Sequence, residues 1–321
     1  MALLFLLNGK EPMLAAAEAA AALHPRDWWR HVPPASEGFA FFPAARKAPT
    51  GLGLAHRAVL TAFAVQDGGD DALLAALDRA PWARIIRDRR FRVRLERIGM
   101  TGGPSERDLA ARIIARVPNS RIDLHTPEIT IDIVRSSERS FGGVRVWENT
   151  ETWRARRVHL WTRPHPTGLD PTVARALVRL AGAHRIHDPC CGAGGLLIEA
   201  GLLGLRVSGA DIDPMMLARA RENTRSLRLR PELRVEDATH WIPRVGAIVT
   251  DLPYGRGTRP VEIERFVRAL LARAGRSTSR AVLGASAPLP AVPGWAVRAR
   301  FTSYVHKSLT RHFTVLERVR A

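Results

Sequence analysis

The chain has 321 residues, 46% of them hydrophobic and 25% charged, which leaves room for two domains and excludes a chain that is disordered throughout. Its 49 Lys and Arg residues against 31 Asp and Glu residues give a formal charge of +18, so a nucleic-acid partner is favoured over an anionic membrane surface. All but three of the basic residues are arginines, a bias that either a GC-rich genome or selection for phosphate binding can produce.

The chain opens with a predicted strand from Met1 to Leu7, followed by an alanine-rich helix from Glu11 to Leu23 with Pro12 in its first turn. The apolar opening run is too short to span a membrane, and no basic flank with a cleavage site makes it a signal peptide. We therefore expect a soluble, cytoplasmic protein without a membrane partner.

Residues 24–50 carry five prolines and are predicted to be irregular. The further elements expected before residue 150 are a strand at 54–65, helices at 70–80 and 105–117, and strands at 129–134 and 140–147. The stretch FRVRLERI, residues 91–98, alternates apolar side chains with arginines, as a strand with one basic face does. Arg92 and Arg94 on that face are candidate RNA contacts. A solvated edge strand explains the same pattern equally well.

Residues 152–168, TWRARRVHLWTRPHPTG, have no clear period and are rich in Arg and Trp. We predict a linker at 151–168 between an N-terminal region, 1–150, and a C-terminal domain, 169–321. Arg154, Arg156 and Arg157 in this linker are further candidate RNA contacts.

Helices and strands alternate from residue 170 onward. The predicted helices are 170–182, 194–203, 213–227 and 260–274, and the predicted strands are 184–188, 205–210, 232–236, 245–250, 279–284, 296–306 and 309–318. This order predicts an α/β fold with a doubly wound, mostly parallel sheet. Ligands of such sheets bind at the carboxyl ends of the strands.

A glycine-rich turn follows the first of these strands in IHDPCCGAGG, residues 186–195, and leads directly into an apolar helix. Glycine lets a ligand approach the backbone, and the free amides at a helix start favour an anionic group. Many purely structural turns look the same, so this signal is weak by itself. The adjacent Cys190 and Cys191 can hardly form an ordinary disulfide with each other, which fits a reducing compartment.

Acidic residues follow the next two predicted strands. Asp211, nineteen residues after Gly192, can accept hydrogen bonds from both hydroxyls of a ribose. Asp213, which precedes Pro214, is the better candidate for capping the following helix. Asp237 can accept a hydrogen bond from an adenine amino group, although this residue alone does not indicate a nucleotide site.

The sequence DLPYG, residues 251–255, follows the fourth predicted strand and so lies at the same edge of the sheet. Methylating an exocyclic amine is difficult because the lone pair of its nitrogen is delocalised into the base. Asp251 and the carbonyl of Leu252 can accept the two amine protons, while Tyr254 stacks on a flipped-out base. Such chemistry works by positioning and electrostatics and needs no metal. Alone the motif is a plain turn, but after the two upstream motifs it indicates amine methylation.

With these motifs the chain resembles the class I methyltransferases that modify guanine N2 in tRNA and carry an N-terminal THUMP domain, best known from archaea. LDPTVARALVRLAGA and YVHKSLTRHFTVLE are similar to flanking parts of their catalytic domain, and FRVRLERIG and RIDLHTPEITIDIV to parts of a THUMP domain. The resemblance implies a seven-stranded Rossmann-like methyltransferase sheet at 169–321 and an α+β THUMP-like tRNA-binding region at 1–150.

The same resemblance implies S-adenosylmethionine as the cofactor and tRNA as the partner, and it indicates no accessory protein subunit. It assigns the catalytic motif to Asp251, Leu252, Pro253 and Tyr254, and cofactor binding to Asp188, Cys190, Gly192, Gly194, Asp211, Ile212, Asp237 and Ala238. The family's usual turn is Asp-Pro-Phe-Cys-Gly-Thr-Gly-Gly and its usual catalytic motif is Asn or Asp followed by Pro-Pro-Tyr or Pro-Pro-Phe. The chain departs from these motifs at Cys190, Ala193 and Leu252.

Position 10 of tRNA is the favoured target by this resemblance, with positions 6 and 26 as other precedents. Methylation of adenine N6 or cytosine N4, in DNA or rRNA, stays an alternative because the same Asp-Pro-Tyr geometry serves these amines. A nicotinamide dehydrogenase is a less favoured alternative, since the turn lacks the third glycine of Gly-x-Gly-x-x-Gly. That function would also leave the DLPYG motif unexplained. A non-catalytic RNA-binding protein is the other class, although all the expected acids are present.

Overall fold

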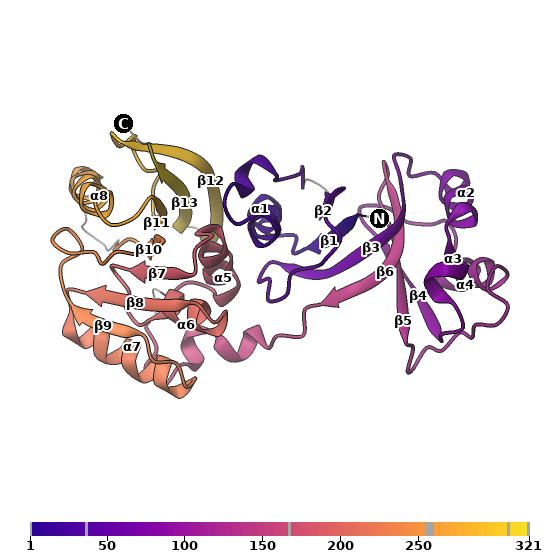
Figure 1. The fold of residues 1–321 in the computed structure, drawn as a ribbon, viewed down its shortest axis with the longest axis horizontal. Coiled ribbons are helices and arrows are strands. Elements are labelled where there is room, and N and C mark those ends of the chain that lie inside the picture. Colours follow the sequence, from indigo (N-terminus) through magenta and orange to yellow (C-terminus); the bar gives the residue numbers. More distant parts are fainter. Residues whose placement is uncertain (1, 36–37, 166–167, 254–259, 307–308, 320–321) are drawn as a thin grey trace. The chain divides into compact units, whose positions relative to one another are not determined.

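A computed structural model describes residues 2–35, 38–165, 168–253, 260–306 and 309–319. These residues form two compact units (Figure 1). The first unit comprises Met1–Pro12, Pro33–Thr50 and Ala55–Asn149, and the second comprises Met13–Val32, Gly51–Leu54 and Thr150–Ala321. In the described ranges, no helix combines the length and the apolar character that crossing a bilayer requires.

The first unit contains a six-stranded sheet in the order β2-β1-β3-β6-β5-β4. Its strands are β1 (Leu3–Leu7), β2 (Phe39–Phe42), β3 (Ala55–Val65), β4 (Phe91–Arg97), β5 (Ile129–Arg135) and β6 (Ser140–Glu148). Neighbouring strands are antiparallel except for β4 and β5, which run parallel. The short β2 lies inside the proline-rich stretch that the sequence predicted to be irregular, so that prediction was wrong there.

Three helices belong to this unit: α2 (Asp70–Arg79), α3 (Trp82–Ile86) and α4 (Glu106–Ile114). Their apolar side chains share one buried cluster with β4 and β5, in which Trp82, Leu109 and Ile131 are nearly inaccessible to solvent. Ser105 caps α4 as the sequence predicted, because its side chain accepts the N–H of Asp108 while the Asp108 carboxylate accepts the N–H of Ser105. The short α3 was not predicted.

The basic strand β4 lies at the edge of this sheet. Arg92 donates a hydrogen bond to the Thr130 hydroxyl at 3.1 Å, and Arg94 reaches the Glu106 carboxylate at 3.4 Å. The structure thus confirms an edge strand with charged side chains. The phosphate contact of these two arginines stays a prediction.

The second unit contains the seven-stranded sheet that the sequence predicted, in the order β12-β13-β11-β10-β7-β8-β9. Its strands are β7 (Arg185–Asp188), β8 (Arg206–Asp211), β9 (Glu232–Val235), β10 (Ala247–Asp251), β11 (Arg280–Ala285), β12 (Trp295–His306) and β13 (Leu309–Arg318). The five strands from β11 to β9 are parallel, whereas β13 is antiparallel to both of its neighbours. This is the doubly wound α/β fold.

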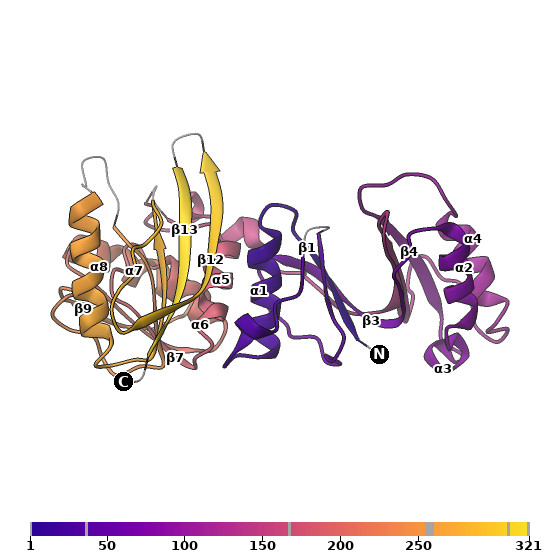
Figure 2. The ribbon, with the colours of Figure 1, turned by 90° about the horizontal axis from the view of Figure 1, so that it is seen from above.

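Four helices follow the predicted alternation: α5 (Pro171–Leu180), α6 (Gly195–Leu202), α7 (Pro214–Ser226) and α8 (Pro260–Ala274). In Figure 2, α8 lies on one side of the strands β12 and β13, while α5 and α6 lie on the other. A buried cluster joins Val267 and Leu271 of α8 to Ile248 of β10 and Leu283 of β11. The helices therefore cover the faces of the sheet, and the carboxyl ends of the parallel strands meet at one edge.

The alanine-rich helix α1 (Pro12–Leu23) and the turn η1 (Trp28–Arg30) lie almost entirely in the second unit, which differs from a division at residue 150. The fully buried Glu18 accepts the backbone N–H groups of Gly53 and Leu54 at 2.7 and 2.8 Å, and the Trp28 indole donates to the carbonyl of Leu180. A helix that is apolar all round must be buried, but its sequence does not say against which part of the chain.

Candidate active site

The first part of the site is the glycine turn between β7 and α6. Gly192 has a φ of +51° and Gly194 a φ of +95°, a conformation that side chains rarely adopt. A Cβ atom at Gly192 would meet nothing within 4 Å, whereas one at Gly194 would lie 3.3 Å from Ala220 of α7. Gly192 therefore leaves its backbone open to a ligand, and Gly194 serves the packing of two helices.

Asp211, at the end of β8, fixes this turn. Its Oδ2 atom accepts the N–H of Gly192 at 2.8 Å, and its Oδ1 atom accepts the N–H of Asp213 at 3.0 Å. Each carboxylate oxygen keeps a further lone pair with which it can bind a ligand hydroxyl. Asp213 accepts the N–H of Met215 at 2.8 Å and so caps α7, as the sequence predicted.

Asp237 lies two residues beyond the end of β9. Its Oδ1 atom accepts hydrogen bonds from the hydroxyl and the N–H of Thr239, both at 2.7 Å. These two bonds hold the pKa of Asp237 below its usual value, so the side chain is an anion at neutral pH.

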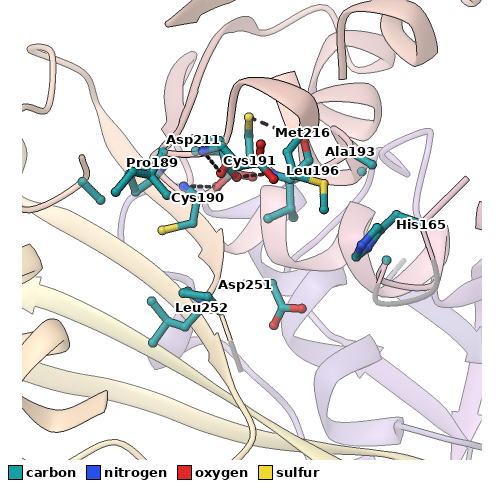
Figure 3. Close-up of a pocket in the computed structure, with 18 of the residues that line it drawn as sticks. His165, Pro189, Cys190, Cys191, Ala193, Leu196, Asp211, Met216, Asp251 and Leu252 are labelled. Atoms are coloured by element: carbon teal, nitrogen blue, oxygen red, sulfur yellow. Dashed lines mark hydrogen bonds between the residues drawn. The ribbon is translucent and has the colours of Figure 1, made fainter. Parts of the chain in front are cut away.

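A cavity of about 670 Å³ lies where these strand ends meet, a size that suits a nucleoside-containing ligand (Figure 3). Nearly all the residues that the resemblance assigned line it: Asp188, Cys190, Gly192, Asp211, Ile212, Asp237, Ala238, Asp251, Leu252 and Pro253. Gly194 does not line the cavity, because it packs against Ala220 of α7. Tyr254 lies outside the described residues.

The cavity is acidic although the chain is strongly basic. Six carboxylates line it, and the lining residues that the structure describes include no Lys or Arg. Burial raises the pKa of Asp188 to about 7, and the negative charges of Asp211 and Asp251 act in the same direction. Burial also raises the pKa of the Cys190 thiol, which therefore stays neutral. Such a cavity suits a ligand that carries positive charge.

Asp251 ends β10 on the opposite side of the cavity from Asp211 (Figure 3). The next residue, Leu252, is anchored because its N–H donates to the carbonyl of Gly284 in β11 at 2.8 Å. The Asp251 Oδ2 atom lies 3.4 Å from Nη2 of Arg311 in β13. An acid is thus held at the cavity with a cation beside it.

The segment predicted as a linker forms a wall of this cavity. Trp161, His165 and Gly168 line it, and the ring of Trp161 lies close to Gly195 at the start of α6. The sequence did not indicate Trp161 and His165 as site residues, nor several other lining residues, among them Met216, Glu236 and Phe266. The density of aromatic residues was the available signal for the first two.

Arg156 holds this wall in place. It donates to Glu199 of α6 at 2.9 Å and to Glu151 at 2.6 Å, and its guanidinium lies 4.4 Å from the ring centre of Trp153. Its side chain is only 13% exposed, which does not favour a phosphate contact. Arg154 and Arg157 are exposed, and their RNA contact stays a prediction.

Comparison with known proteins agrees with this geometry. Residues 156–287 match the family model UPF0020, the RMKL-like methyltransferase domain. A "tRNA (guanine(10)-N2)-dimethyltransferase" of Methanothermobacter thermautotrophicus is 30% identical over 348 aligned positions, which cover 99% of this chain and 100% of the relative. The enzyme of the same description from Pyrococcus abyssi is 32% identical over 83% of this chain and 84% of its own length.

Among solved structures, TrmN from Thermus thermophilus matches 99% of this chain and 100% of its own, with a TM-score of 0.53 and 25% identity. The fold, the matched domain and the full-length relatives agree with one another. The chain therefore belongs to the family of the tRNA (guanine(10)-N2)-dimethyltransferases and is a methyltransferase of that family.

Proposed function

We propose that the protein transfers a methyl group from S-adenosylmethionine to the exocyclic N2 amine of a guanosine in tRNA, with position 10 as the target. The observation that carries this proposal is the meeting of Asp188, Asp211 and Asp251 at one cavity on the carboxyl edge of the sheet. The names of the two archaeal relatives give tRNA guanine as their substrate, and the charge of +18 supports a polyanionic partner.

The residues of the cavity fit the cofactor. Its sulfonium and ammonium groups suit the acidic lining, with Asp188 as the partner of the ammonium. The free lone pairs of Asp211 are available for the ribose hydroxyls, and Asp237 with Ala238 is available for the adenine. Ile212, which is 70% exposed, offers apolar surface to the adenine ring. When bound, the cofactor supplies an electrophilic methyl group.

Asp251 and Leu252 act on the nucleophile. The Asp251 carboxylate accepts one proton of the guanine amine in a hydrogen bond, and the backbone carbonyl of Leu252 accepts the other. Both bonds draw the nitrogen lone pair out of conjugation and towards the methyl group. The amine loses one proton as the new N–C bond forms, and the Asp251 carboxylate accepts that proton. Pro253 stiffens the turn that carries the carbonyl, and Tyr254 stacks on the flipped-out base. Catalysis in this scheme is mainly the positioning of two reactants.

The role of Asp251 is tested with Asp251→Ala. We expect the variant to bind tRNA and S-adenosylhomocysteine as the wild type does and to lose at least about a hundredfold in single-turnover rate, as when a preorganised hydrogen-bond partner is removed from an active site. Unchanged turnover would show that another group handles the amine. A shared loss of turnover and of cofactor binding would place Asp251 in the cofactor site instead.

The substrate is tested with the purified wild-type chain, labelled S-adenosylmethionine, and either tRNA or duplex DNA. Label in tRNA, with N2-methylguanosine or N2,N2-dimethylguanosine among the nucleosides by mass spectrometry, is the expected result. Fragment mapping then gives the position. Label only in DNA, or methylation of adenine or cytosine, would overturn the proposal, and binding without any transfer would support a non-catalytic RNA-binding protein.

A further inference from the structure

Asp251 sits at a point where three neighbouring strands meet. It ends β10 and is in register with Gly284 of β11, which is in register with Phe313 of β13. A Cβ atom at position 284 would lie 2.5 Å from the Asp251 Oδ1 atom and 3.2 Å from the Phe313 ring. The carboxylate therefore extends across β11 in the space that the glycine leaves.

On the far side of that space, Arg311 forms an ion pair with the Asp251 carboxylate. It lies two residues before Phe313 in β13, its side chain is 6% exposed, and its Nη2 atom is 3.4 Å from the Asp251 Oδ2 atom. Asp251 is 17% exposed and lines the cavity, whereas Arg311 lies behind it. The cation can thus act on a ligand through Asp251.

The positive charge of Arg311 offsets the repulsion between two carboxylates of the cavity. Asp188 and Asp251 repel each other, since Asp251 contributes to the raised pKa of Asp188. A cation on the other side of Asp251 offsets this repulsion. Burying a guanidinium is itself costly, and its place beside an acid of the cavity gives that burial a reason in the site.

We propose that Arg311 is a positioning residue for methyl transfer: its guanidinium holds the Asp251 carboxylate over Gly284, in the direction in which it accepts the amine proton. This inference rests on the proposed role of Asp251. It predicts that the contribution of Arg311 to the rate depends on the negative charge at position 251. A purely structural role would slow the reaction whatever residue stands there.

A double-mutant cycle separates the two roles. Single-turnover methylation of tRNA at saturating S-adenosylmethionine is measured for the wild type, Arg311→Met, Asp251→Asn and the double variant. We expect Arg311→Met to slow the wild-type reaction about tenfold or more, and to slow the Asp251→Asn reaction by less than about twofold, because the neutral amide no longer needs the cation. The dissociation constant of S-adenosylhomocysteine should stay within about twofold throughout.

Two further variants keep the test decisive. Arg311→Lys retains a cation and should recover part of the rate, and it replaces Arg311→Met in the cycle if the latter does not fold. Arg298→Met removes another arginine of the same hairpin, one that is paired with Glu317 at 2.7 Å, and should leave the rate unchanged.

Equal slowing by the Arg311 substitution in both backgrounds overturns the proposal and makes Arg311 a structural residue. A wild-type chain that transfers no methyl group to tRNA overturns the proposed function itself, and the positioning role with it. The two failures are distinguished by the first measurement of the series.

Discussion

The Asp211 carboxylate accepts the backbone N–H of Gly192 at 2.8 Å, which ties the end of β8 to the turn that follows β7. These residues are nineteen positions apart in the chain, and the bond gives the glycine turn a fixed place beside an acid. Both groups face one cavity, so the contact preorganises the part of the site that would bind a ribose.

Asp211→Asn should weaken cofactor binding because an amide side chain offers one acceptor where the carboxylate offers two. We expect the dissociation constant of S-adenosylhomocysteine to rise by about ten- to a hundredfold in calorimetry, the loss typical of a charge-assisted hydrogen bond. Asp213→Asn is the matched control, since it removes the same charge from the same cavity but leaves Gly192 untouched. Equal losses in both variants would assign the effect to charge alone.

Binding of the cofactor should depend on pH through Asp188, whose pKa of about 7 is raised by burial. An ammonium placed beside this carboxyl favours its ionised form, so binding releases a proton. The affinity for S-adenosylhomocysteine should therefore rise with pH up to about pH 7 and level off above it, and the dependence should vanish in Asp188→Asn. 5′-Methylthioadenosine, which lacks the ammonium, should bind with no such dependence. A dependence that survives in Asp188→Asn would show that Asp188 is not its source.

Much of this site could be predicted because its residues follow strands. The glycine turn and the acids at the ends of β7, β8, β9 and β10 occur at regular places in an alternating pattern, and a parallel sheet brings such places together. Trp161 and His165 stand in a segment without a period, so nothing local indicated that it folds against the site. The pairing of Arg311 with Asp251 depends on β13 lying beside β11, which a pattern of helices and strands does not specify.

The arginines of residues 154–157 should differ in their effect on tRNA binding. Replacing the exposed Arg154 and Arg157 by Ala should weaken binding and reduce the slope of log K against log salt concentration by about one to two, if both contact phosphates. Arg156→Ala should leave the slope nearly unchanged and lower stability, because Arg156 is paired with Glu199 and Glu151. A flattened slope for Arg156→Ala alone would show that its ion pairs open for RNA.

Glu18 should be essential to the stability of the second unit. Each of its carboxylate oxygens accepts one backbone N–H, from Gly53 and from Leu54, so Glu18→Gln places an amide NH2 group against one of these donors. At pH 8, where Glu18 is ionised, we expect the free energy of unfolding to fall by about 1–3 kcal/mol, the cost of leaving a buried donor unsatisfied. Glu232→Gln, at an exposed position of β9 in the same unit, is the control and should have no measurable effect on stability.

The pH dependence of this loss has a definite sign. Burial raises the pKa of Glu18 from 4.5 to about 7, so the folded state binds its proton more tightly than the unfolded state does. The wild type therefore loses the stability that the protonated Glu18 contributes as the pH rises from about 4.5 to about 7, whereas Glu18→Gln has no such proton. Denaturant unfolding at pH 5 and at pH 8 should show a larger difference between the two proteins at pH 5. A difference that grows with pH would mean that Glu18 is buried as a stable anion, held by its two backbone hydrogen bonds.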